Sequence, residues 1–125
     1  MTITQALARI DELQPNTVST ALKVAWLSEL DGMLFTETLQ THEDCPCDSF
    51  PGYTPATPGT TVLLAAEPYG PELYTRWLEY QINLANGETA RAANSVTLYN
   101  AAVLAWQNAW TRRHRPLSPV EKFTY

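Results

Sequence analysis

Residues 71–115 read PELYTRWLEYQINLANGETARAANSVTLYNAAVLAWQNAWTRRHR, and this stretch decides the fold. Its apolar residues recur every three or four positions, which is typical of an amphipathic helix. Pro71 suits the first turn of a helix, where its missing N–H costs nothing, and Pro116 ends the pattern. The apolar residues at helical spacing are Tyr74, Trp77, Leu78, Ile82, Ala85, Val96, Tyr99, Val103, Trp106 and Trp110.

This stretch is too long to form one straight helix. Such a helix would measure about 67 Å at roughly 1.5 Å per residue, whereas a compact domain of this size is only roughly 35 Å across. The favoured break is Asn86-Gly87, because glycine adopts the left-handed conformation that ends helices. The alternative is Asn94-Ser95, a good N-cap pair. Either break predicts an antiparallel helical hairpin, and the favoured one gives helices over residues 71–86 and 88–114.

The N-terminal third predicts two more helices, over residues 3–14 and 19–41. Thr2 and Gln5 have the spacing of a capping box, and Pro15 ends the first helix. Gly32, inside the second helix, predicts a close helix contact or a small bend. The expected core face of the second helix consists of Leu22, Trp26, Leu30, Met33 and Leu34, flanked by Leu27 and Phe35.

Residues 42–70 predict a long loop, because they hold most of the prolines and three of the five glycines. Only residues 60–65 (TTVLLA) suggest a short extended or strand-like segment. Phe50 and Tyr53 are expected to attach the loop to the helices. Residues 116–125 form a proline-broken tail that is either frayed or docked on a neighbour. The predicted fold is therefore all-α: a small helical bundle over residues 1–125 with a C-terminal hairpin.

Composition excludes several classes of protein. A chain of 125 residues is expected to form one domain. Its net charge of −5 argues against nucleic acid as the main partner. No apolar run approaches the length of a membrane span, and the amphipathic N-terminus carries acids, unlike a signal peptide. Two cysteines close together without an export signal predict an intracellular setting.

The charges are unevenly distributed along the chain. No basic residue lies between Lys23 and Arg76, whereas that interval holds eight acidic residues. From Thr89 onward the balance is reversed, with five basic residues against Glu121. This separation suits head-to-tail association, in which one surface of a subunit meets a different surface of the next. Chance clustering on solvated faces is an equally weighted alternative.

The sequence offers little evidence of catalysis or cofactor binding. Cys45-Pro46-Cys47, close to His42, is the only cluster that resembles a site, but zinc sites normally use C-x2-C with a second ligand pair. The second histidine, His114, lies far along the chain, so incidental loop thiols are the preferred interpretation. Acids on the helices are expected on solvated faces, and no catalytic motif occurs. We therefore expect neither an enzyme nor a bound cofactor or metal.

Three segments resemble small phage and prophage virion assembly proteins of the head–tail connector, or adaptor, family. They are PGY (residues 51–53), TVLLAAEPYGPELY (residues 61–74) and residues 81–116. The resemblance implies an all-helical fold, a ring of about a dozen copies beneath the portal, and no catalysis. It also implies portal and tail-completion proteins as partners, a location in the virion after assembly in the host cytoplasm, and a loop or tail that changes conformation on docking.

The candidate interface combines the charge separation with the proline-broken flanks. We expect Arg112, Arg113 and Arg115 to contact acids of the middle segment in a neighbouring subunit. A helix-capping and salt-bridging role for these arginines is favoured over contact with DNA. The expected acidic partners are Glu43, Asp44 and Asp48, and the tail aromatics are Phe123 and Tyr125.

Two other functions stay open at this point. One is another phage neck, tail-completion or packaging accessory protein, which the sequence does not separate from a connector. The other is a small thiol- or metal-dependent regulator that uses Cys45, Cys47 and His42.

Overall fold

A computed structural model describes residues 1–117 of the chain. The order of elements is α1 (Ile3–Leu13), α2 (Thr20–Glu37), the short 3-10 helix η1 (Leu39–Thr41), α3 (Gly70–Ala85) and α4 (Thr89–Arg113). The described residues contain no β-strand, so the all-α class is confirmed. None of these helices combines the length and the apolar character needed to cross a membrane.

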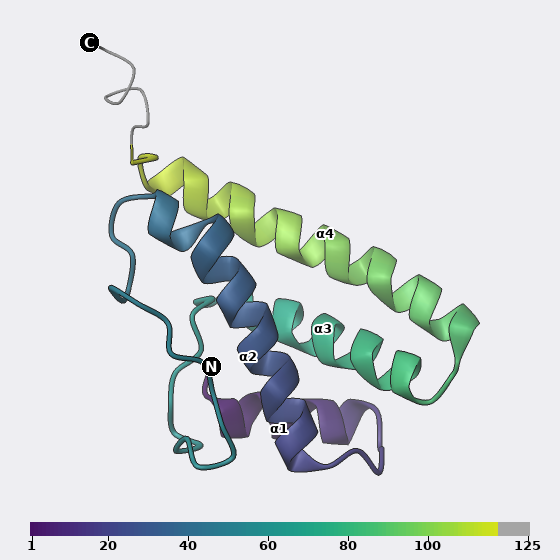
Figure 1. The fold of residues 1–125 in the computed structure, drawn as a ribbon. Helices are drawn as coiled ribbons and strands as arrows, with labels where there is room; N and C mark the ends of the chain where they lie inside the picture. Colours follow the sequence, from purple (N-terminus) through teal and green to yellow (C-terminus); the bar gives the residue numbers. More distant parts are fainter. Residues whose placement is uncertain (118–125) are drawn as a thin grey trace.

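Helices α3 and α4 run side by side in opposite directions (Figure 1). The chain turns between them at Asn86–Glu88, where Gly87 has a φ of +70°. Ser95 lies inside α4, so the break falls at the first of the two alternatives. Within the described residues, α3 is the only α-helix that packs closely along α4, whereas α3 also contacts α1 and α2. One broad face of α4 is therefore left uncovered by helices.

The ends of the first two helices follow from local chemistry. Thr2 Oγ1 accepts a hydrogen bond from the backbone N–H of Gln5 at 3.2 Å, and Gln5 Oε1 accepts one from the N–H of Thr2 at 2.9 Å. Ser19 caps α2 by accepting from the N–H of Leu22 at 3.2 Å. Helix α2 ends at Glu37, earlier than the predicted residue 41, because Thr38 leaves the helical conformation.

The core lies where α1, α2 and α3 meet. On α2 the predicted core residues Trp26, Leu30 and Leu34 are buried. Leu22 is instead 43 % exposed, and Lys23 and Leu27 are buried as well. The largest fully buried apolar side chains are Ile10, Leu27, Leu30, Leu34, Leu39, Leu73, Tyr74, Leu78 and Ile82.

Lys23 is buried because it has partners on the preceding segment. Its Nζ donates to Asp11 Oδ1 at 2.6 Å and to Asn16 Oδ1 at 3.2 Å. Partial burial acts to raise the pKa of Asp11, but the hydrogen bonds from Lys23 and Asn16 and the charge of Lys23 outweigh it and lower the pKa. This pair joins α1 to the start of α2.

Asp31 corrects the expectation that acids on the helices lie on solvated faces, because its carboxylate is fully buried. Oδ1 accepts a hydrogen bond from the Tyr74 hydroxyl at 2.6 Å. Oδ2 accepts from the Tyr53 hydroxyl at 2.5 Å and from the Leu64 N–H at 3.0 Å. The Tyr74 hydroxyl itself accepts from the Ala65 N–H at 2.8 Å. One carboxylate of α2 therefore holds α3 and two parts of the long loop.

Burial and charge shift the pKa values of this cluster in a consistent direction. Desolvation raises the pKa of Asp31 above its usual range, although the three hydrogen bonds it accepts oppose that rise. Burial and the neighbouring Asp31 carboxylate raise the pKa values of Tyr53 and Tyr74 well above 10.0. Both hydroxyls therefore stay protonated and donate to Asp31 at neutral pH.

The loop between η1 and α3 is held at several further points. Phe50 packs edge-on against Tyr53 with ring centroids 5.1 Å apart. Gly32 of α2 faces the ring of Phe50, so its close contact is with the loop rather than with a helix. Residues 60–65 do not form the expected strand: Val62 makes one isolated bridge with Thr2. A lone bridge forms there because the chain enters α1 directly after Thr2.

We predict that Tyr74→Phe destabilises the protein by about 2 kcal/mol or more, because it removes a donor from a buried carboxylate and leaves the Ala65 N–H unpaired. Tyr53→Phe should cost less, about 1–2 kcal/mol, because Tyr53 is only partly buried. Urea unfolding measures both free energies. Tyr80→Phe is the control, since the Tyr80 hydroxyl makes no hydrogen bond within residues 1–117. Equal effects at positions 74 and 80 would contradict this role of Asp31.

Two glycines should respond oppositely to alanine. A Cβ added at Gly32 would lie 3.7 Å from Phe50, an ordinary contact, so Gly32→Ala should stabilise the protein by about 0.5–1 kcal/mol through helix propensity. A Cβ at Gly70 would lie 2.3 Å from the Ala65 carbonyl oxygen, so Gly70→Ala should destabilise it by about 1–3 kcal/mol. The melting temperature of each variant, compared with that of the unaltered protein, tests this prediction. A change of the same sign in both variants would show that the steric argument fails.

Candidate functional site

The structure brings the basic end of α4 and the acidic start of the loop together at one end of the molecule (Figure 1). The Glu43 N–H donates to the Arg115 carbonyl at 2.8 Å, and the Leu117 N–H donates to the Thr41 carbonyl at 2.6 Å. His42 and Pro116 form an antiparallel bridge between these two bonds. We call residues 41–48 and 112–117 the C-terminal junction.

An aromatic stack leads into the C-terminal junction along α4. Trp106, Trp110 and His114 follow one another at intervals of four residues, which places them on one helix face. The ring centroids of Trp106 and Trp110 are 6.2 Å apart, and those of Trp110 and His114 only 3.8 Å apart. The His114 Nδ1 lies 3.2 Å from Asp44 Oδ2. Asp44 has a positive φ of 61°, which turns the loop back toward α4.

Glu43 and Asp44 lie beside the basic end of α4, but the predicted acids and arginines are not paired with one another. Asp44 contacts His114 rather than an arginine, a contact that sequence reasoning missed because the two residues are 70 positions apart. Within residues 1–117, no salt bridge involves any of the three candidate arginines or the other two acids. These five exposed residues are Arg112, Arg113, Arg115, Glu43 and Asp48. Phe123 and Tyr125 lie outside the described residues.

The two cysteines, Cys45 and Cys47, lie in the same part of the loop, and both are free thiols. Cys45 Sγ donates to the Cys47 carbonyl at 3.0 Å. Burial, followed by the neighbouring Cys45 and the charges of Asp48 and Asp31, raises the pKa of Cys47, which disfavours the reactive thiolate. His42 Nδ1 donates to the Thr38 carbonyl at 2.7 Å. In residues 1–117, no three side chains of histidine, cysteine, aspartate or glutamate are grouped closely enough to hold a metal ion.

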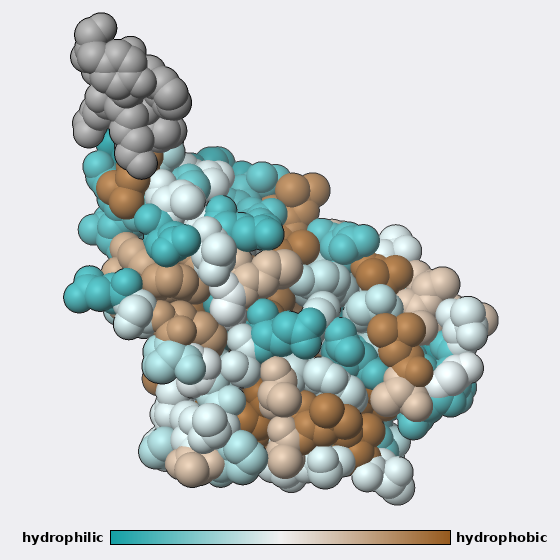
Figure 2. Space-filling model, in the orientation of Figure 1, coloured by the Kyte–Doolittle hydropathy of each residue, from teal (hydrophilic) through white to brown (hydrophobic). Residues whose placement is uncertain are grey.

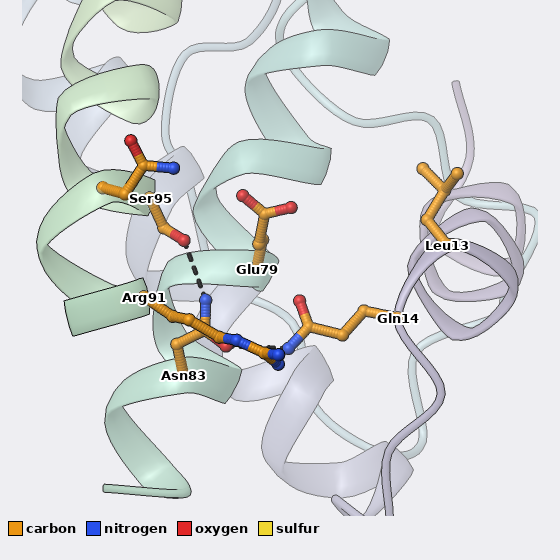
Figure 3. A pocket seen from close by; sticks show the side chains of 7 residues that line it. Leu13, Gln14, Glu79, Asn83, Arg91 and Ser95 are labelled. Atoms are coloured by element: carbon orange, nitrogen blue, oxygen red, sulfur yellow. Dashed lines mark hydrogen bonds between the residues drawn. The ribbon is translucent and has the colours of Figure 1, made fainter. Parts of the chain in front are cut away.

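An open hollow of about 310 Å³ lies at the opposite end of the hairpin, between α1, α3 and α4 (Figure 3). Its floor is a polar chain in which Gln14 Nε2 donates to Asn83 Oδ1 and Asn83 Nδ2 donates to Ser95 Oγ, both at 2.8 Å. Because these bonds satisfy the buried Asn83 amide, the chain serves to join three helices. Its rim residues Glu79 and Arg91 carry opposite charges and bind their own helical neighbours, Arg76 and Glu88.

A smaller hollow of about 80 Å³ lies beside the C-terminal junction. It is lined by Ala66, Glu67, Tyr69, Trp106, Ala109, Trp110, Arg113 and His114. Trp110 Nε1 is buried without a hydrogen-bond partner in the described part of the chain. The three members of the aromatic stack, Trp106, Trp110 and His114, therefore form one wall of this hollow.

We predict that His114→Ala loosens the C-terminal junction without unfolding the protein. The change removes the stacking on Trp110 and the contact with Asp44, so the Glu43 and Leu117 amides should exchange with solvent about tenfold faster. Hydrogen exchange measured residue by residue checks this. Arg112→Ala is the control, because its side chain makes no hydrogen bond within residues 1–117. Unchanged exchange in His114→Ala would show that the backbone bridge is sufficient.

Comparison with known proteins does not assign the chain to a family. No protein-family model, curated protein or solved structure matches it.

Proposed function

We propose that the protein is a structural phage protein of the head–tail connector, or adaptor, kind, which assembles as a ring between portal and tail and has no catalytic activity. The sequence resemblance over residues 51–53, 61–74 and 81–116 supports this proposal. The helical fold agrees with the all-helical subunit that the resemblance implies.

The main structural support for this proposal is the arrangement of charges at the C-terminal junction. It presents exposed arginines on the α4 side and exposed acids on the loop side, and these groups form no ion pairs with one another within the subunit. Neighbours arranged side by side around a ring would place the acidic side of one C-terminal junction against the basic side of the next. Opposite charges across such a contact favour the correct orientation and speed association. The chain beyond Leu117 starts from the same place, from which the tail would reach the portal or a tail-completion protein.

The buried ionisable groups favour a structural role over an enzymatic one. Lys23 and Asp31 are the charged side chains in the core, and each is occupied by hydrogen bonds that join helices. The larger hollow has a floor of satisfied amides and a rim whose charges are paired locally. The Ser95 hydroxyl in the lining of the larger hollow accepts a hydrogen bond from Asn83, and within residues 1–117 it makes none to the nearby Glu79 carboxylate.

Reversing the arginine charges tests the proposed ring contact. We expect the double variant Arg112→Glu, Arg113→Glu to be folded but to be lost from virus particles by at least about tenfold, because it places like charges against Glu43 and Asp48 of the neighbour. The readout is the copy number of this protein relative to the capsid protein, measured by mass spectrometry of purified particles. The unaltered protein should be present at about a dozen copies.

Two further variants make this test specific. Arg91→Glu changes the same kind of charge at the other end of α4 and should leave incorporation unchanged. Adding Glu43→Arg and Asp48→Arg to the double variant should restore incorporation, because the charges are then exchanged across the contact. Absence of the unaltered protein from particles would overturn the connector assignment. Normal incorporation of the double variant would overturn the assigned contact.

A further inference from the structure

The outer face of α4 is uncharged and uncovered. Between Arg91 and Arg112 the helix has no charged residue, and α3 covers only its opposite side. Leu98 is 37 % exposed and Leu104 is 56 % exposed. Figure 2 shows separate brown residues, with white and teal ones between them, along the side of the molecule that α4 forms. The exposed residues on this face are Ala90, Asn94, Thr97, Leu98, Ala101, Leu104, Ala105 and Asn108, which we call the α4 stripe.

The residue types of the α4 stripe are arranged nearly symmetrically about Ala101. Leu98 and Leu104 stand three residues before and after Ala101, and Asn94 and Asn108 stand seven residues before and after it. Such a pattern suits an antiparallel two-fold contact, in which each position of one copy meets the matching position on the other side of Ala101 in the second copy.

We propose that the α4 stripe pairs with the α4 stripe of a second copy, antiparallel and across a two-fold axis at Ala101. Leu98 then packs against the partner's Leu104, and the Asn94 amide meets the partner's Asn108 amide, which it matches as both donor and acceptor. The small side chains of Ala101 and Ala105 allow the two helix axes to approach to about 8–10 Å.

The ends of α4 favour an antiparallel pair over a parallel one. In this arrangement Arg112 lies level with the partner's Ala90, at the start of α4, where Glu88 and Arg91 pair with each other and leave no net charge. The positive N-terminal end of one helix dipole also lies beside the negative C-terminal end of the other. A parallel pair would instead place Arg112 against its own counterpart.

The contact is small and independent of the proposed ring. The interface has eight side chains on each copy, fewer than the roughly 20–30 residues a side of a standard interface. The dimer should therefore be weak and should dissociate on dilution. A two-fold contact closes on itself and cannot generate a ring alone. It also uses the outer face of α4 rather than the C-terminal junction, so it holds whether or not the connector proposal does.

Sedimentation equilibrium of the full chain over a wide concentration range tests the pairing. The unaltered protein should convert from monomer to dimer, and Ala101→Glu should raise the dissociation constant at least about tenfold, because it places two carboxylates together on the axis. Ala8→Glu, the same substitution at an exposed position of α1, should leave the dissociation constant unchanged. A monomer at every concentration, or association unaffected by Ala101→Glu, would overturn the proposal.

Disulfide cross-linking tests the direction of the pair. In a background with Cys45→Ser and Cys47→Ser, a mixture of Leu98→Cys and Leu104→Cys proteins should form mainly the mixed disulfide dimer under mild oxidation. A preference of each variant for its own kind would overturn the antiparallel arrangement. Circular dichroism of every variant shows that the helices are retained, which is expected because the changed stripe positions are exposed.

Discussion

The buried carboxylate of Asp31 is the constraint on which the arrangement of the helices and the loop depends. A charged group in the core is costly unless donors surround it, and here two tyrosine hydroxyls and a backbone N–H do so. The donors come from the loop and from α3, so satisfying one side chain of α2 fixes the positions of both. A proline-rich segment with almost no backbone pairing of its own gains a defined course over the core in this way.

The positions of helices α3 and α4 could be predicted from the sequence because their signals are local. Apolar spacing, Pro71 and Asn86-Gly87 each act within a few residues, and the structure has α3 and α4 with a turn at Asn86–Glu88. The burial of Lys23 and Asp31 was not predicted, because it depends on partners elsewhere in the chain. Asp31 in particular resembles any exposed helical acid until Tyr53 and Tyr74 are brought to it, and no periodicity indicates that meeting.

The candidate site was predicted in its composition but not in its geometry. Sequence reasoning selected the arginines near residue 113 and the acids near residue 44, and the structure places both groups at one end of the molecule. Backbone hydrogen bonds join the two groups, and the side-chain contact between them is made by His114, which stacks on Trp110 and lies 3.2 Å from Asp44. The contact with Asp44 depends on the loop returning to α4, which the sequence does not encode locally, whereas the stacking joins residues only four positions apart.

The contacts that close this helical protein have a consequence for how fast it folds. Asp31 and Tyr74 are 43 positions apart, and Asp44 and His114 are 70 positions apart. Helical bundles usually fold quickly because most of their contacts are local. Here the chain must close two long segments, at an entropic cost, before the carboxylate cluster and the C-terminal junction can form. Its folding rate should therefore be closer to that of mixed α/β domains of similar size than to that of simple helical bundles.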